Sequence, residues 1–242
     1  MDCQPRSLNA VYRWLKINHS CLLCDEPSDG TLPLCHGCED DLPWLLSHCP
    51  CCAEPLPSAQ LCPRCQRKQP AFHQVISPLR YAFPVDALLT RFKADHASHY
   101  GRLLCQLLAR ELQHHFNDGL AKPDLLLPVP QSPQRLRQRG FNQALWLTRW
   151  LSRELKLPWQ KHWLSDNGQH LSQKTLDAKA RARNLNSAFS LTKQAQPQGQ
   201  HIALVDDIVT TGSTANAISQ VLLKAGAQQV DIYCLARTAR SQ

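Results

Sequence analysis

Residues 202–214 read IALVDDIVTTGST, and this stretch decides the fold that we expect. Its first four residues are aliphatic, a composition typical of a strand that is buried on both faces of a parallel sheet. Asp206 and Asp207 follow directly and would lie at the carboxyl end of that strand. Open α/β sheets bind their ligands at this edge. The stretch therefore predicts an α/β domain with two carboxylates in a ligand site.

A run of small and hydroxyl-bearing residues comes next and leads into a segment with the apolar spacing of a helix. A short loop that opens a helix leaves several backbone N–H groups unpaired, and the helix dipole favours an anion there. The alternative is that the hydroxyls only cap the helix. Two adjacent carboxylates are costly to bury without a ligand, so we favour a ligand with hydroxyls and a phosphate, such as ribose 5-phosphate. The run consists of Thr210, Thr211, Gly212, Ser213 and Thr214.

The chain has 242 residues, which is enough for one medium domain and a small one. Residues 1–19 carry scattered basic residues and neither an unbroken apolar stretch nor a small-residue cleavage site, so they do not resemble a secretion signal. No apolar stretch approaches the length of a membrane span. We therefore expect a cytoplasmic protein without membrane insertion, in a reducing setting where paired cysteines favour metal over disulfide.

Ten of the twelve cysteines precede residue 66, and eight of them form four Cys-x-x-Cys pairs. Two such pairs supply four thiolates to one tetrahedral Zn²⁺ ion, so four pairs predict two structural zinc sites. Metal binding would also supply the folding free energy of a segment with little continuous apolar sequence. In the simplest, sequential grouping one site consists of Cys21, Cys24, Cys35 and Cys38, and the other of Cys49, Cys52, Cys62 and Cys65.

Other arrangements of the cysteines stay open. The pairs can interleave between the two sites, Cys51 can replace a neighbour, and His36 or His48 can serve as a fourth ligand. Redox-active dithiols are a further alternative, but they usually occur as one motif at a helix start rather than as four in tandem. We favour zinc for this reason.

Basic residues are concentrated in the middle of the chain. The formal net charge is +8, which eight thiolates on two Zn²⁺ ions would lower to about +4. Residues 122–193 contain thirteen Lys and Arg against four Asp and Glu. Such a segment favours a polyanionic partner, either nucleic acid or a pyrophosphate-bearing ligand, although a solvated basic surface explains the charge equally well.

The composition changes after Cys65, and residues 66–70 look like a linker. We expect a zinc-binding domain over residues 1–68, beginning with a helix at 8–17, and an α/β domain over residues 69–242. Strands are expected at 75–81, 125–130, 202–205 and 230–235, and helices near 85–93, 103–116, 144–155 and 215–223. Their alternation indicates βαβ units and a mainly parallel sheet flanked by helices.

Position by position, residues 202–214 resemble the signature of the type I phosphoribosyltransferases, which bind 5-phosphoribosyl-1-pyrophosphate (PRPP). The resemblance implies that Asp206 and Asp207 are the catalytic positions and engage the ribose hydroxyls. It also implies that residues 210–214 hold the 5′-phosphate and that Mg²⁺ binds with PRPP. Residues 169–184 resemble the loop that closes over the site in this family, where closure excludes water.

Other basic residues are candidates for the pyrophosphate. The loop after the 125–130 strand carries Arg135, Arg137 and Arg139, which can grip a pyrophosphate or form a basic turn on the surface. Lys93 resembles a family position and is expected to approach the same pyrophosphate.

Four features together look like the ComF family, and the resemblance covers nearly the whole chain. They are the Cys-x-x-Cys pairs, the PVP segment at 128–130 with RQRGFNQ at 137–143, the stretch 173–189, and the PRPP signature. Members pair a double zinc ribbon with a phosphoribosyltransferase domain and are linked to natural competence or to the use of DNA as a nutrient (the GntX type). The resemblance implies competence proteins as possible partners.

Two classes of function follow. As a binding module, the protein would hold PRPP with Mg²⁺ and also single-stranded DNA, through its basic half and four tryptophans on which bases can stack. The same tryptophans can equally belong to the core. As an enzyme of nucleotide salvage, it would transfer the phosphoribosyl group to a base, although no residue stands out as a general base. The tryptophans are Trp146, Trp150, Trp159 and Trp163.

Overall fold

The computed structural model describes residues 19–28, 30–94, 99–168 and 188–239. The chain divides into two compact units, Met1–Leu42 and Pro43–Gln242. The first unit contains the antiparallel pair β1 (His19–Ser20) and β2 (Pro27–Ser28) and the short helix α2 (His36–Asp40). The helix expected at residues 8–17 lies outside the described residues. Within the described part of the chain, no helix is long and apolar enough to cross a membrane.

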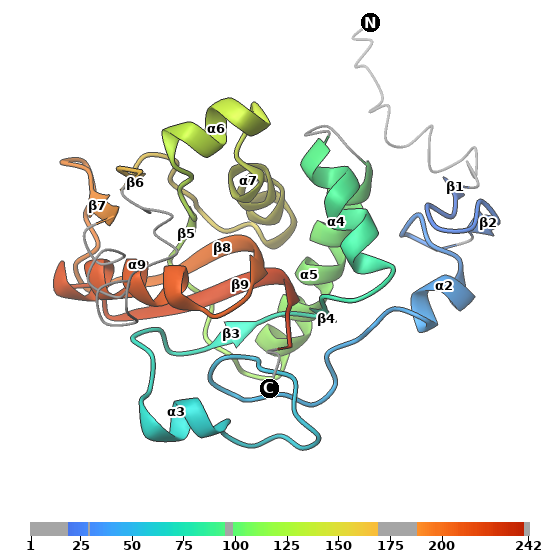
Figure 1. The fold of residues 1–242 in the computed structure, drawn as a ribbon, viewed down its shortest axis with the longest axis horizontal. Helices are drawn as coiled ribbons and strands as arrows, with labels where there is room; N and C mark the ends of the chain where they lie inside the picture. The colour runs from blue at the N-terminus through green and yellow to red at the C-terminus, as the bar shows by residue number, and fades with distance from the viewer. Residues whose placement is uncertain (1–18, 29, 95–98, 169–187, 240–242) are drawn as a thin grey trace, which may run out of the picture. The chain divides into compact units, whose positions relative to one another are not determined.

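A five-stranded parallel sheet forms the centre of the second unit (Figure 1). Its strands lie in the order β3 (Val75–Ile76), β9 (Gln229–Arg237), β8 (His201–Val209) and β5 (Leu125–Pro128), and β4 (Leu79–Arg80) also pairs with β9. The single strand expected at 75–81 is interrupted at Pro78, because proline has no N–H for the ladder. The parallel sheet flanked by helices confirms the predicted fold class.

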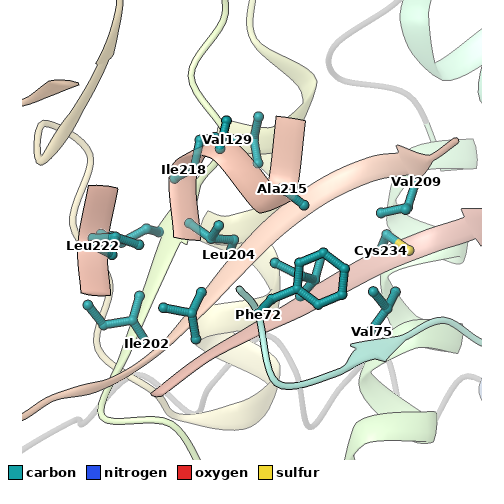
Figure 2. Packing of buried hydrophobic residues seen from close by; sticks show 14 of the residues in the cluster. Phe72, Val75, Val129, Ile202, Leu204, Val209, Ala215, Ile218, Leu222 and Cys234 are labelled. Atoms are coloured by element: carbon teal, nitrogen blue, oxygen red, sulfur yellow. The ribbon is translucent and has the colours of Figure 1, made fainter. Parts of the chain in front are cut away.

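Helices cover both faces of this sheet (Figure 1). The helices α4 (Val85–Ala94), α5 (His99–Asn117) and α7 (Gln143–Leu155) pack together on one face, and α9 (Ser213–Lys224) lies on the other. Because strand side chains alternate between faces, Ile202 and Leu204 of β8 lie on the same side and pack with Ile218 and Leu222 of α9 (Figure 2). This packing holds the start of α9 beside the carboxyl end of β8.

Several short elements complete the second unit. They are α3 (Pro63–Arg67), α6 (Pro133–Arg139) and the antiparallel pair β6 (Leu164–Asp166) and β7 (Phe189–Leu191). Helix α6 occupies a segment that we expected to be a loop. Ser132 caps it by accepting a hydrogen bond from the backbone N–H of Arg135, and Gly140 ends it at φ +78°. This combination of a Ser-Pro start and a Gly end is a recognisable helix signal.

The second group of cysteines is part of the core of the second unit. Cys49, Cys52, Cys62 and Cys65 are buried in one hydrophobic cluster with residues of β8, β9 and α9. Phe72 and Val75 connect the same cluster to the sheet (Figure 2). The compact units divide between Leu42 and Pro43. The boundary after residue 68, between a zinc-binding domain and an α/β domain, stays a prediction. Residues 66–70 lie inside the second compact unit.

Candidate functional site

The acidic pair lies where β8 extends past its neighbour β5. Strand β5 pairs with β8 only as far as Pro128 opposite Val205, whereas β8 continues to Val209 alongside β9. Asp206 and Asp207 therefore belong to the last part of β8, which extends beyond the end of β5. Both residues are partly buried. The expectation ended the strand at residue 205, because the two carboxylates interrupt the apolar pattern there. Pairing with β9 carries the strand further.

The two carboxylates repel each other, and one lysine offsets part of the repulsion. The Nζ atom of Lys93, in α4, lies 3.1 Å from Oδ2 of Asp207. Burial, followed by the neighbouring charge of Asp207, raises the pKa of the Asp206 carboxyl well above its usual range, and Lys93 works in the opposite direction. The backbone N–H of Asp207 also donates to Oδ1 of Asp206 at 2.9 Å. The pair is therefore suited to a ligand that brings hydroxyl donors or a cation.

The loop 210–212 joins β8 to α9. Gly212 is the residue that precedes the helix, at φ +72°, and no side chain caps the helix there. This left-handed conformation favours glycine. The hydroxyls of Thr211 and Ser213 lie 2.8 Å apart, and the backbone N–H of Ser213 donates to Thr211 Oγ1 at 3.3 Å. Thr210 and Thr211 are exposed, and Ser213 and Thr214 are partly exposed. Backbone N–H groups and hydroxyls thus meet at an accessible helix start, which suits an anion.

Two arginines that the sequence analysis did not single out contact this loop. Arg237, at the end of β9, donates to the backbone carbonyls of Val209 and Thr210, and Arg64, in α3, donates to the carbonyl of Thr211. An arginine at the end of an apolar strand could have been recognised in the sequence as a candidate for a specific contact, because arginine is rarely buried without a partner.

The three arginines proposed for the pyrophosphate lie on α6. Arg135, Arg137 and Arg139 are all exposed, and the helix buries none of its residues. Only four residues separate the end of β5 from the start of α6. Helix α6 therefore follows the carboxyl end of β5 closely in the chain, and Nη1 of Arg139 donates to Oε1 of Gln143 at 3.4 Å. The expected closing loop at residues 169–184 lies outside the described residues.

The eight cysteines of the Cys-x-x-Cys motifs form two groups of four, and these are the groups that the sequential arrangement predicts. In each group the sulfur atoms lie within 4.8 Å of one another. Four thiolates around one Zn²⁺ at about 2.3 Å would lie about 3.8 Å apart, and the sulfurs of Cys24 and Cys35, and of Cys52 and Cys62, are each 3.6 Å apart. The group Cys21, Cys24, Cys35 and Cys38 belongs to the first compact unit, and the group Cys49, Cys52, Cys62 and Cys65 to the second.

Each group combines a thiol whose pKa is lowered with thiols whose pKa is raised. Burial raises the pKa of the Cys21 thiol, but backbone N–H donors outweigh it and bring the pKa down to about 6. Burial likewise raises the pKa of the Cys49 thiol, but the backbone N–H donors of Cys62, Cys52 and Cys51 outweigh it and bring the pKa down to about 7. Burial and neighbouring thiols raise the pKa of Cys52 to about 11. Four thiolates cannot share such a space without a cation, so both four-cysteine sites are consistent with structural zinc.

Two family models match the chain. A double zinc ribbon domain matches residues 17–66, and a phosphoribosyl transferase domain matches residues 156–242. The first match contains both cysteine groups. The second contains β8, the acidic pair, loop 210–212 and α9.

Curated relatives align with most of the chain. The DNA utilization protein YhgH of Escherichia coli strain K12 is 36% identical over 90% of this chain and 96% of its own length. Competence protein F of Haemophilus influenzae is 34% identical over 84% of this chain and 90% of its own. Competence protein ComFC of Bacillus subtilis is 26% identical over 90% and 95%.

Solved phosphoribosyltransferases are more distant. Adenine phosphoribosyltransferase of Saccharomyces cerevisiae is 18% identical, with a TM-score of 0.36, over 55% of this chain and 68% of that chain. The assignment of family rests instead on the relatives that align over most of their length and on both matched domains. On that basis, the chain belongs to the ComF family of competence and DNA-utilisation proteins, with a double zinc ribbon and a phosphoribosyltransferase domain.

Proposed function

We propose that the protein binds PRPP with Mg²⁺ at the end of β8, as part of the use or uptake of DNA. The observation that carries this proposal is the acidic pair at the carboxyl end of β8, followed directly by the start of α9, where Gly212 offers no side-chain cap. Carboxylates accept hydrogen bonds from hydroxyls, and backbone N–H groups donate to phosphate. The two halves of the site therefore match the two halves of a ribose 5-phosphate.

Each group in the site has a proposed role. Asp206 and Asp207 would accept hydrogen bonds from the ribose hydroxyls, and residues 210–214 would hold the 5′-phosphate through N–H groups and hydroxyls. Lys93 and the exposed arginines of α6 would neutralise the pyrophosphate. Mg²⁺ prefers oxygen ligands and phosphate oxygens, so the paired carboxylates fit it, directly or through water. The metal would neutralise charge on the pyrophosphate.

A calorimetric titration tests the proposal directly. Zinc-loaded protein is titrated with PRPP in the presence and absence of Mg²⁺, and ribose 5-phosphate serves as a ligand without pyrophosphate. We expect saturable binding that is tightest for PRPP with Mg²⁺. A folded, zinc-loaded protein that binds none of these ligands would overturn the proposal.

Replacing Lys93 with glutamine is expected to weaken PRPP binding about tenfold at neutral pH, because the site loses one charge-assisted contact. Lys93 also lowers the pKa of Asp206, so its removal should raise that pKa further. Binding that needs an ionised Asp206 should then require a higher pH. Titrations at several pH values check both effects.

Arg91→Gln is the matched control for Lys93→Gln. Arg91 lies in the same helix, but its guanidinium donates to the hydroxyl of Tyr100. We expect this variant to bind PRPP as the unaltered protein does. Equal affinity and an equal pH profile for Lys93→Gln and the unaltered protein would show that Lys93 is not part of the site.

Single-stranded DNA is a second proposed ligand. Exposed arginines on α5 and α7 lie against tryptophan rings of α7 and support this proposal. The guanidinium carbon of Arg149 lies 5.5 Å from the ring centre of Trp146, which is partly exposed. Trp150 and Trp163 are buried and belong to the core. Binding through a basic surface should weaken steeply with salt, which fluorescence anisotropy with a labelled oligonucleotide measures.

Catalysis is a separate question from binding. The alternative of an active phosphoribosyltransferase requires release of pyrophosphate when a base is added to the complex with PRPP and Mg²⁺. A screen of bases for pyrophosphate release distinguishes an enzyme from a binding module. Competence proteins remain proposed partners, and a cytoplasmic location remains a proposal as well.

A further inference from the structure

Arg237 is fully buried and connects the second cysteine group to the proposed phosphate loop. Its Nε donates to the backbone carbonyl of Cys52 at 2.9 Å, and its Nη2 pairs with Glu54 Oε2 at 2.6 Å. Its Nη1 donates to the carbonyls of Val209 and Thr210, the first at 3.1 Å. One planar guanidinium thus holds two segments that lie far apart in the sequence, because its donors form a rigid fork.

Arg64 makes a second connection of the same kind. It lies in α3, which begins directly after Cys62 and contains Cys65. Its Nη1 donates to the backbone carbonyl of Thr211 at 2.7 Å. Since the sulfurs of Cys62 and Cys65 belong to the second cysteine group, the position of α3, and with it that of Arg64, is tied to that group.

These contacts determine which way the loop presents its backbone. The carbonyls of Val209, Thr210 and Thr211 all accept hydrogen bonds from arginines that are anchored in the cysteine-rich segment. In a trans peptide the N–H points opposite to the carbonyl. The N–H groups of Thr210, Thr211 and Gly212 are therefore directed away from the two arginines, as an anion site at the start of α9 requires.

Two packing contacts support the same arrangement. The backbone N–H of Ala71 donates to the side-chain oxygen of Asn216, in the first turn of α9, at 2.8 Å. A side chain at Gly212 would lie 3.7 Å from the ring of Phe72, so the segment after α3 lies against the loop itself.

We propose that Arg237 and Arg64 are positioning residues, through which the second zinc ribbon orients the N–H groups of loop 210–212 for a phosphate. We refer to Arg64, Arg237, Glu54 and the Cys52 carbonyl as the ribbon–loop contact. The expected effect of this contact on PRPP affinity rests on the proposed function. Its effect on the orientation of the loop N–H groups does not. The contact therefore gives this zinc ribbon a role in the ligand site in addition to its role in folding.

Arg64→Ala tests the contact without disturbing the core, because Arg64 is exposed. We expect the NMR order parameters of the backbone N–H groups in loop 210–212 to fall from about 0.85 toward about 0.6, and PRPP affinity to fall about threefold. Arg67→Ala is the matched control. Arg67 is exposed on the same helix, and its Nε donates to the carbonyl of Pro63 within that helix. It should change neither measurement.

Arg237→Lys tests the buried half of the contact. Lysine keeps the charge but cannot hold both segments with one planar group, so we expect a loss of PRPP affinity of about tenfold. Should this variant not fold, Arg64→Ala still decides the question. Loop order parameters that are the same in Arg64→Ala, Arg67→Ala and the unaltered protein would overturn the proposal. Lower loop order parameters in Arg64→Ala, in a protein that does not bind PRPP, would support the contact and refute the proposed ligand.

Discussion

The double variant Asp206→Asn, Asp207→Asn is expected to bind PRPP with Mg²⁺ at least about 100-fold more weakly than the unaltered protein. Hydrogen bonds to charged groups each contribute about 1.5–3 kcal/mol, and the variant converts two such acceptors into neutral amides. A 100-fold loss of affinity corresponds to about 2.7 kcal/mol, which is close to the lower limit for two such hydrogen bonds. Calorimetric titration measures the loss.

The same variant should be at least as stable as the unaltered protein. Because the pKa of Asp206 is raised in the folded state, ionisation of this carboxyl opposes folding. The protonated carboxyl contributes to the free energy of unfolding at low pH, and this contribution is lost as the pH rises through the pKa of the folded state. Removing the charge should therefore raise the melting temperature at neutral pH and have little effect below about pH 4, where aspartate is protonated in the unfolded chain as well. Weak binding with a lowered melting temperature would indicate damage to the fold instead.

Replacing Cys62 with serine is expected to have the largest effect on stability. Structural zinc contributes about 10–16 kcal/mol of binding free energy in zinc-finger peptides, and loss of a metal is among the few changes that exceed about 4 kcal/mol. Cys62 is buried in the same hydrophobic cluster as β8 and α9, so its loss should destabilise the whole Pro43–Gln242 unit. Zinc analysis and thermal unfolding measure the two consequences.

Cys24→Ser provides the comparison. Cys24 is exposed and belongs to the Met1–Leu42 unit. Both variants should lose one of two zinc ions, but only Cys62→Ser should lower the melting temperature of the larger unit and weaken PRPP binding. Equal melting temperatures for the two variants would contradict the placement of the second cysteine group in the core.

The ligand end of β8 could be predicted from sequence because its chemistry is local. Thirteen consecutive residues carry the strand, the acidic pair and the loop, and the Cys-x-x-Cys spacing is local in the same way. The end of β8 at Val209 could not be predicted, because hydrogen bonds to β9 extend the strand past two carboxylates. Helix α6 had usable local signals in Ser132, Pro133 and Gly140.

The features that the sequence did not reveal depend on distant residues. Arg237 and Glu54 are 183 positions apart, and no local pattern connects them. The packing of the second cysteine group against the sheet has the same origin. Cysteine spacing groups all four pairs together, but the core of the larger unit includes Cys49, Cys52, Cys62 and Cys65. Lys93 matched a family position, yet its ion pair with Asp207 becomes visible only when α4 lies beside β8.

A crystal structure of the zinc-loaded protein with PRPP and Mg²⁺ is the most direct measurement. We predict that the ribose hydroxyls lie within hydrogen-bonding distance of Asp206 and Asp207. The 5′-phosphate should accept from the N–H groups of residues 210–214, while the carbonyls of loop 210–212 stay bonded to Arg64 and Arg237. A ligand bound elsewhere, with Asp207 still paired with Lys93, would contradict a phosphoribosyl site at the end of β8.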